Sequence, residues 1–121
     1  MDISVIIPLL NENDSIVELN DSIKEVVKAY NFSYEIIFID DGSNDGSWQT
    51  IQKLSSDNLA VKGIKFHRNY GKSQALHAGF LKSEGKVVFT MDADLQDDPK
   101  EIPAMYDLSL IHISEPTRQW Q

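Results

Sequence analysis

Four short runs of β-branched and apolar residues constrain this 121-residue chain more than any other feature. Each run is nearly continuous in apolar character, which is typical of strands buried on both faces of a parallel sheet. The sequence therefore predicts a sheet covered on both sides. The predicted strands are Ile3–Pro8, Tyr34–Asp40, Ala60–Phe66 and Lys86–Met91.

Segments with helical spacing of apolar residues separate these runs. Ser15 and Glu18 have the spacing of a capping box at the start of the first segment, and Asp45 or Ser47 is placed to cap the second. A further helix is expected near Pro99. This alternation predicts an α/β fold with a parallel sheet and right-handed crossovers. The predicted helices are Ser15–Tyr30, Ser47–Ser55 and Lys72–Lys82.

Polar side chains follow all four predicted strands. Ligands of parallel α/β sheets bind beyond the carboxyl ends of the strands, so we expect these side chains on one rim. They are Asn11 and Glu12, Asp40 and Asp41, Arg68, and Asp92 and Asp94, in strand order.

The net charge of −8 argues against nucleic acid or an anionic membrane surface as a charge-driven partner. An anionic ligand would therefore need a metal ion or a local anion site. The absence of cysteine excludes thiolate chemistry and fits a reducing compartment. Neither a basic signal-peptide region nor an apolar run of about 20 residues is visible, so we expect a cytoplasmic location.

The segment Asp92-Ala93-Asp94-Leu95-Gln96 follows a buried strand. In extended backbone alternate residues point the same way, so Asp92, Asp94 and Gln96 would offer three oxygen ligands to one side. Oxygen ligands suit Mg²⁺ or Mn²⁺. The plain alternative is a solvated acidic turn before the helix near Pro99.

The turn from Asp40 to Ser47 is rich in glycine and small polar residues, and most of it reads as structural. A carboxylate at this strand end is different, because it can accept a hydrogen bond from a base or a ribose hydroxyl. The stretch from His67 to Lys72 is the concentrated basic spot, where Arg68 and Lys72 could meet phosphate or base oxygens. The alternative is that Arg68 and Lys72 are surface cations that only balance the negative charge of the rim.

Common phosphate-binding loops are missing. Gly71-Lys72-Ser73 lacks the earlier glycine of a P-loop, since that position is Phe66. The first strand leads into Leu9–Asn13, where a dinucleotide-binding fold would need glycines. No nucleophile motif is visible either, so catalytic residues stay unassigned.

Four motifs in this order resemble the nucleotide-binding half of a family 2 inverting glycosyltransferase with the GT-A fold. The resemblance is closest to the polyprenyl-phosphate group, such as dolichyl-phosphate mannose synthase and undecaprenyl-phosphate sugar transferases. It runs from Ile3 to about Tyr106. The motifs are Ser4–Pro8 with Asn11-Glu12, Ile39–Gly46, Arg68–Lys72 and Asp92–Gln96.

The resemblance implies roles for individual residues. Pro8, Glu12 and Asp41 would surround the nucleoside, with Asp40 as a neighbour. Arg68 and Lys72 would lie near base or phosphate. The metal and the sugar diphosphate would be held by Asp92, Asp94 and Gln96.

The resemblance also implies a reaction. A UDP- or GDP-linked hexose or amino-hexose would pass with inversion to a polyprenyl phosphate, or to a glycan hydroxyl, in a parent enzyme at the cytoplasmic face of the membrane. A polyprenyl phosphate is already anionic and needs little general-base help, whereas a hydroxyl would need a carboxylate. A sugar nucleotidyltransferase and an inactive nucleotide-binding fragment are the competing hypotheses.

The end of the chain has a separate resemblance. Residues 108–118 are similar to the translation of a transposase-type sequencing-library adapter. We therefore expect residues 1–107 to be the incomplete amino-terminal half of a GT-A domain, and residues 108–121 to be a non-native read-through tail.

Overall fold

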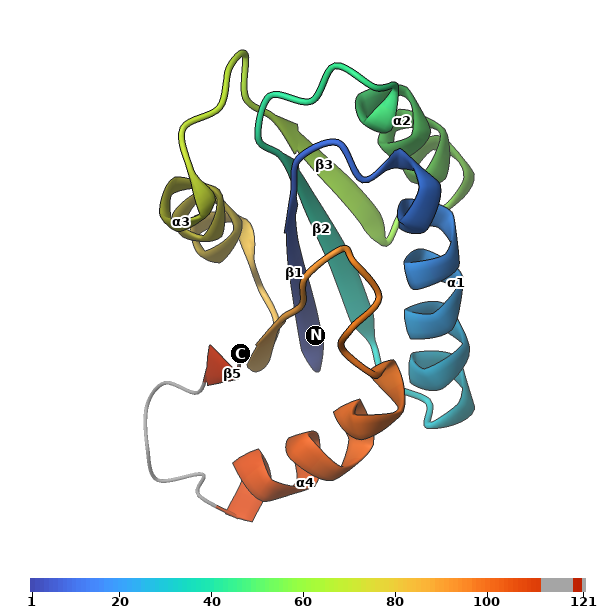
Figure 1. The fold of residues 1–121 in the computed structure, drawn as a ribbon. Coiled ribbons are helices and arrows are strands. Elements are labelled where there is room, and N and C mark those ends of the chain that lie inside the picture. The colour runs from blue at the N-terminus through green and yellow to red at the C-terminus, as the bar shows by residue number, and fades with distance from the viewer. Residues whose placement is uncertain (112–118, 121) are drawn as a thin grey trace.

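A computed structural model of the chain describes residues 1–111 and 119–120 (Figure 1). Its parallel sheet has the strand order β3-β2-β1-β4-β5, with β1 in the centre. The strands are β1 (Ile3–Leu9), β2 (Tyr34–Asp40), β3 (Val61–Lys65), β4 (Val87–Thr90) and β5 (Gln119–Trp120). The helices are α1 (Asn13–Ala29), α2 (Ser47–Asp57), α3 (Lys72–Lys82), the 3₁₀ turn η1 (Pro99–Glu101) and α4 (Ile102–Ile111).

The predicted strands and helices are confirmed to within about two residues at each end. The two-residue strand β5, parallel to β4, was not expected from the sequence. The predicted boundary at residue 107 falls inside α4 and stays a prediction. Residues 112–118 and 121, most of the predicted non-native tail, lie outside the described residues.

The core has one layer on each face of the sheet (Figure 1). On one face α1, α2 and α4 cover alternate strand residues such as Ile36 and Phe38. On the other face α3 covers Ile37 and Ile39. A Cβ on Gly79 of α3 would lie 2.4 Å from Cγ2 of Ile6, so only glycine allows this close approach of helix and sheet. The period of two along each strand thus determines which helix each side chain meets.

The predicted capping box is wrong. Helix α1 begins at Asn13, which puts Ser15 inside its first turn, where the Ser15 hydroxyl donates to the carbonyl of Ala93. The backbone N–H of Asn13 instead donates to the Asp45 carboxylate, 3.1 Å away. Asp45 also accepts from the backbone N–H of Ser47 at the start of α2. One loop carboxylate therefore serves two helix starts, which local sequence spacing does not reveal.

A buried acidic residue joins the amino ends of the strands. The Glu35 side chain is fully buried and accepts hydrogen bonds from the Ser4 hydroxyl, the Glu84 backbone N–H and the Lys62 ammonium, each 2.6 Å long. Burial alone would raise the pKa of Glu35, but the bonds from Lys62, Ser4 and Glu84 outweigh it and lower the pKa. The ionised carboxylate therefore stabilises the folded state.

Glu35→Gln should lower the free energy of unfolding at pH 7 by about 1.5–3 kcal/mol, the range for hydrogen bonds to a charged group. Because the folded pKa lies below the unfolded value of 4.5, the wild-type advantage is present above pH 4.5 and fades as the pH falls through the folded pKa. Urea unfolding across this pH range measures it. Glu25→Gln, on the exposed side of α1, is the control and should change little.

Candidate functional site

Two neighbouring pockets lie at the carboxyl ends of β1, β2 and β4. They share Pro8, Lys72 and Asp92, and we call them together the rim cleft. Parallel sheets bind their ligands at this edge, so the cleft is the candidate site. The first pocket adds Leu9, Leu10, Asp41, Asn69 and Gly71, and the second adds Leu76, Thr90, Met91 and Asp97.

Pro8 opens the cleft by ending one hydrogen-bond ladder. The carbonyl of Ile6 accepts a hydrogen bond from the backbone N–H of Met91. The backbone N–H and C=O groups of every second residue of β1, counted from Ile6, therefore point toward β4. The next bond in this ladder would be donated by residue 8, and proline has no N–H. The pairing of β1 with β4 accordingly stops at Thr90, and the chain after Met91 is free to diverge from β1.

Asp41 ties the end of β2 to the loop before α3. Its carboxylate is almost fully buried and accepts the backbone N–H groups of Tyr70 and Gly71, at 2.7 and 3.0 Å. The next residue, Gly42, has φ of +87°, and a Cβ there would lie 2.5 Å from the backbone of Arg68. Asp41 therefore both lines the cleft and positions the loop that leads to Lys72.

Asp40 lies on the opposite face. It follows Phe38 by two residues, so its side chain points to the layer of α1 and α2. One carboxylate oxygen accepts the backbone N–H of Ser43 at 2.8 Å. The other is buried without a hydrogen-bond partner among the described residues. The structure therefore separates the two adjacent aspartates: it brings Asp41 to the cleft and Asp40 beneath the turn.

The basic loop is organised around an aromatic ring. The Arg68 guanidinium lies 4.6 Å from the centre of the Tyr70 ring, a cation–π contact. The Tyr70 hydroxyl lies 3.0 Å from Nε2 of His67. Asn69, between Arg68 and Tyr70 in the sequence, and Lys72, two residues after Tyr70, line the cleft. Sequence reasoning thus named Arg68 and missed Asn69, although Asn69 belongs to the same motif.

The segment that carries the predicted metal ligands is not extended throughout. Met91 and Ala93 are buried while Asp92 and Asp94 are exposed, so the expected alternation holds this far. It ends at Leu95, which has a left-handed φ of 66°. The expectation that Gln96 continues an extended row is therefore wrong, because the backbone turns between Ala93 and Leu95. The backbone N–H of Gln96 donates instead to the Asp94 carboxylate, 3.2 Å away.

A lysine already pairs with the first of these carboxylates. The Lys72 ammonium lies 2.8 Å from Oδ1 of Asp92. Its hydrogen bond to Asp92, with the nearby charges of Asp97 and Asp94, raises the pKa of Lys72. The backbone N–H of Asp92 donates to the Asp97 carboxylate at 3.0 Å. Among the described residues, no group of three His, Cys, Asp or Glu side chains has an arrangement that could hold a metal ion.

Glu12 lies at the start of α1, beside the segment that carries Asp92 and Asp94. The Ser15 hydroxyl is 3.3 Å from Oε2 of Glu12 and also contacts the carbonyl of Ala93. Within the described residues, the structure brings Pro8, Asp41, Lys72 and Asp92 together in the lining of the cleft. The predicted site residues outside that lining are Glu12, Asp40, Arg68, Asp94 and Gln96.

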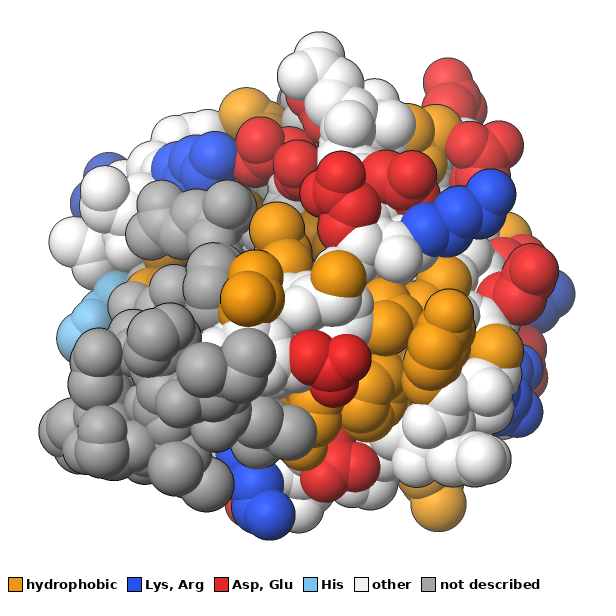
Figure 2. Space-filling model, turned by 90° about the horizontal axis from the view of Figure 1, so that it is seen from below, with side chains coloured by type: hydrophobic (Ala, Val, Ile, Leu, Met, Phe, Trp, Pro, Cys, Tyr) orange, Lys and Arg blue, Asp and Glu red, His pale blue; other side chains and the backbone are white. Residues whose placement is uncertain are grey.

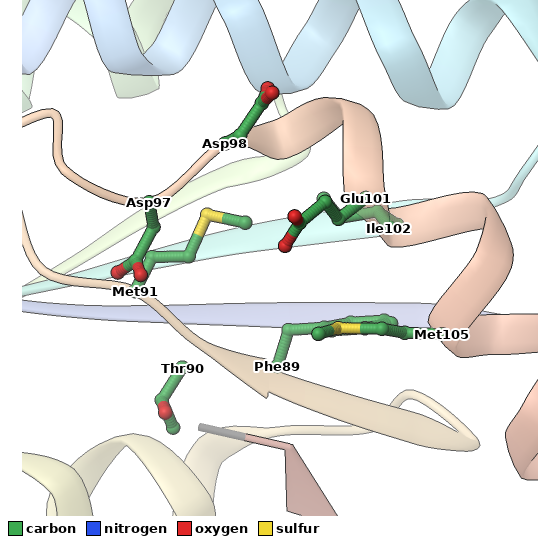
Figure 3. Close-up of a pocket in the computed structure, with 8 residues that line it drawn as sticks. All are labelled: Phe89, Thr90, Met91, Asp97, Asp98, Glu101, Ile102 and Met105. Carbon is green, nitrogen blue, oxygen red and sulfur yellow. The ribbon is translucent and has the colours of Figure 1, made fainter.

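A third pocket lies between β4 and the start of α4 (Figure 3). The apolar side chains of Phe89 and Met105 and the carboxylates of Asp97 and Glu101 are among the groups that line it. Hydrophobic side chains also gather beside acidic ones on the lower face of the molecule (Figure 2). Asp97 lines this pocket and the rim cleft alike, so the two are adjacent.

Among the described residues, no helix is long and apolar enough to span a membrane.

The family model for glycosyl transferase family 2 matches residues 4–109. The chain belongs to this family. The undecaprenyl-phosphate 4-deoxy-4-formamido-L-arabinose transferase of Pseudomonas fluorescens SBW25 is 41% identical over 87% of the chain and 31% of that protein. The dodecaprenyl-phosphate galacturonate synthase of Rhizobium johnstonii is 34% identical, with the same coverage. The chain thus spans about a third of the length of these relatives.

Solved structures agree on the fold. TarS residues 1–349 of S. aureus with UDP-GlcNAc has a TM-score of 0.76 at 24% identity, over 93% of this chain and 32% of that one. A Pyrobaculum calidifontis mannosyltransferase with GDP-Man and Mn²⁺ has a TM-score of 0.73 at 22% identity, over 95% and 33%. The predicted family and GT-A fold are confirmed, whereas the roles of individual site residues stay predictions.

Asp41→Asn should destabilise the protein by about 1.5–3 kcal/mol, because the amide group replaces one of the two acceptor oxygens with a donor. The loop before α3 should loosen first. Hydrogen exchange at Tyr70 and Gly71 should therefore accelerate more than exchange in the sheet. Asp21→Asn, on the exposed side of α1, controls for the loss of charge. Unchanged exchange at both loop amides would contradict the positioning role of Asp41.

Proposed function

We propose that this chain binds a nucleotide diphosphate sugar together with a divalent cation, and that the whole enzyme transfers the sugar to a polyprenyl phosphate. The observation that carries the proposal is the convergence of Pro8, Asp41, Lys72 and Asp92 on one cleft at the carboxyl ends of the strands. The names of the similar proteins support both substrates, since they mention polyprenyl phosphates, UDP-GlcNAc and GDP-Man.

The nucleoside is proposed to lie against Pro8 and Asp41. Each oxygen of the Asp41 carboxylate accepts one backbone N–H and keeps a lone pair for a base or ribose hydroxyl. Glu12 and Asp40 are proposed as its outer neighbours. Arg68 and Lys72 are proposed to meet the base or the phosphates, and Lys72 is the better placed because it lines the cleft.

Asp92 and Asp94, with Gln96, are proposed to hold Mg²⁺ or Mn²⁺. Two exposed carboxylates from one short segment are a hard oxygen set that fits such an ion. Asp92 already holds a cationic group, the Lys72 ammonium, so its carboxylate is accessible to positive charge. When bound, the ion would neutralise the diphosphate and favour its departure.

The acceptor is proposed to be anionic. The phosphate of a polyprenyl phosphate can attack the anomeric carbon directly, with inversion, so this chain's residues need only orient the donor. A glycan hydroxyl, the alternative acceptor, would require an added carboxylate as general base. A polyprenyl acceptor would bring the whole enzyme to the cytoplasmic face of a membrane.

A sugar nucleotidyltransferase is the weaker candidate. Such an enzyme would need a glycine-rich phosphate loop after the first strand. Here β1 leads through Leu10 and Asn11 to Glu12, with no glycine. We therefore favour the transferase.

Calorimetric titration of the 121-residue chain with UDP and GDP, with and without Mn²⁺, tests the proposal. We expect one nucleotide to bind only when Mn²⁺ is present. The double variant Asp92→Asn, Asp94→Asn should weaken this binding at least about tenfold, because even indirect support of a metal ligand is worth 10- to 100-fold.

The matched control is Asp14→Asn, Asp21→Asn, which removes two exposed charges from α1. It should leave the affinity unchanged. Metal-independent binding, or equal loss in both double variants, would count against the proposal.

A further inference from the structure

The ion pair between Lys72 and Asp92 lies between the two pockets of the rim cleft, since both residues line both pockets. Their side chains are 62% and 50% exposed, so water competes strongly for each charge. Ion pairs as exposed as this are weak and exchange readily. A stronger partner for either charge can therefore dissociate this ion pair, which we call the cleft bridge.

Hydrogen bonds hold the backbone in place at both residues of the cleft bridge, Lys72 and Asp92. Lys72 is the first residue of α3 and follows Gly71, whose N–H is bound by the Asp41 carboxylate. The N–H of Asp92 is bound by the carboxylate of Asp97. The two side chains can thus separate while their attachment points stay where they are.

A divalent cation on Asp92 would meet the Lys72 ammonium at the same carboxylate. Two positive charges at one carboxylate repel each other, so lysine and metal compete for Asp92. A nucleotide diphosphate changes the balance, because its phosphates offer the displaced ammonium a new anionic partner. Lysine thus opposes the metal when it comes alone and assists it when it comes with the nucleotide.

We propose that Lys72 is an exchangeable counter-ion of Asp92, which disfavours binding of the metal alone and couples the metal to the nucleotide. The inference rests on the proposed function, because it assigns the regulation of the same site. By thermodynamic linkage, the factor by which the nucleotide strengthens metal binding equals the factor by which the metal strengthens nucleotide binding. Removing Lys72 should reduce that shared factor.

The first arm of the test measures Mn²⁺ alone, by electron paramagnetic resonance of the free ion in solutions of the 121-residue chain. Lys72→Ala should bind Mn²⁺ about two- to fivefold more tightly than wild type, the fold-change that matches an exposed ion pair. Lys82→Ala is the matched control, because it removes the same charge from the other end of α3. It should leave the affinity close to wild type.

The second arm repeats the titration with UDP or GDP at saturating Mn²⁺. Here Lys72→Ala should bind the nucleotide more weakly than wild type, and Lys72→Arg, which keeps the charge, should recover part of the loss. The two arms thus move in opposite directions for one substitution. A merely structural role for Lys72 would weaken both.

Mn²⁺ affinity in Lys72→Ala that equals or falls below that of Lys82→Ala overturns the inference. Failure of the proposed function looks different: the wild-type chain would then bind no nucleotide in the presence of Mn²⁺. Tighter Mn²⁺ binding by Lys72→Ala with weaker nucleotide binding supports the exchange.

Discussion

The parallel pairing of β1 with both β2 and β4 is the constraint on which the rest of the structure depends. It brings the carboxyl ends of three strands to one edge, where residues far apart in sequence line one cleft. The connecting helices pack on the two faces, α1 and α2 on one and α3 on the other. The same pairing places Glu35 opposite Ser4 at the other end, so the charged residues there serve stability and those at the carboxyl edge remain available for a ligand.

The cleft exists because the regular pairing stops at defined residues. Pro8 withholds the N–H that would extend the ladder to β4, and the left-handed Leu95 turns the acidic segment away from an extended path. Asp41 acts in the opposite sense, since its carboxylate draws the loop before α3 toward the end of β2. The candidate site therefore forms where the segment after β4 leaves the sheet and the loop before α3 is hydrogen-bonded to the end of β2.

The limits of the sequence reasoning follow from the range of the interactions involved. Strands and helices were predictable because burial and helical spacing are local patterns. The hydrogen bond that satisfies the first N–H of α1 was not, because its acceptor is Asp45, more than thirty residues away. Alternation along a strand does separate Asp40 from Asp41, but which of them meets the cleft depends on where the helices pack. The resemblance to a family supplied the list of site residues, and only the fold could divide it into those that line the cleft and those that lie behind it.

The excess of acidic residues can be reconciled with an anionic ligand by considering what each carboxylate contacts. Asp41 faces two backbone N–H groups, Asp45 faces two helix starts, and Asp92 faces an ammonium. A net charge of −8 therefore overstates the repulsion that a nucleotide meets at this edge. What remains exposed is a mixed set of charges, in which Lys72 and Asp92 neutralise each other until other partners replace them. The proposed exchange of Lys72 would make this set favour a cation and an anion that arrive together over either arriving alone, as a metal–nucleotide complex requires.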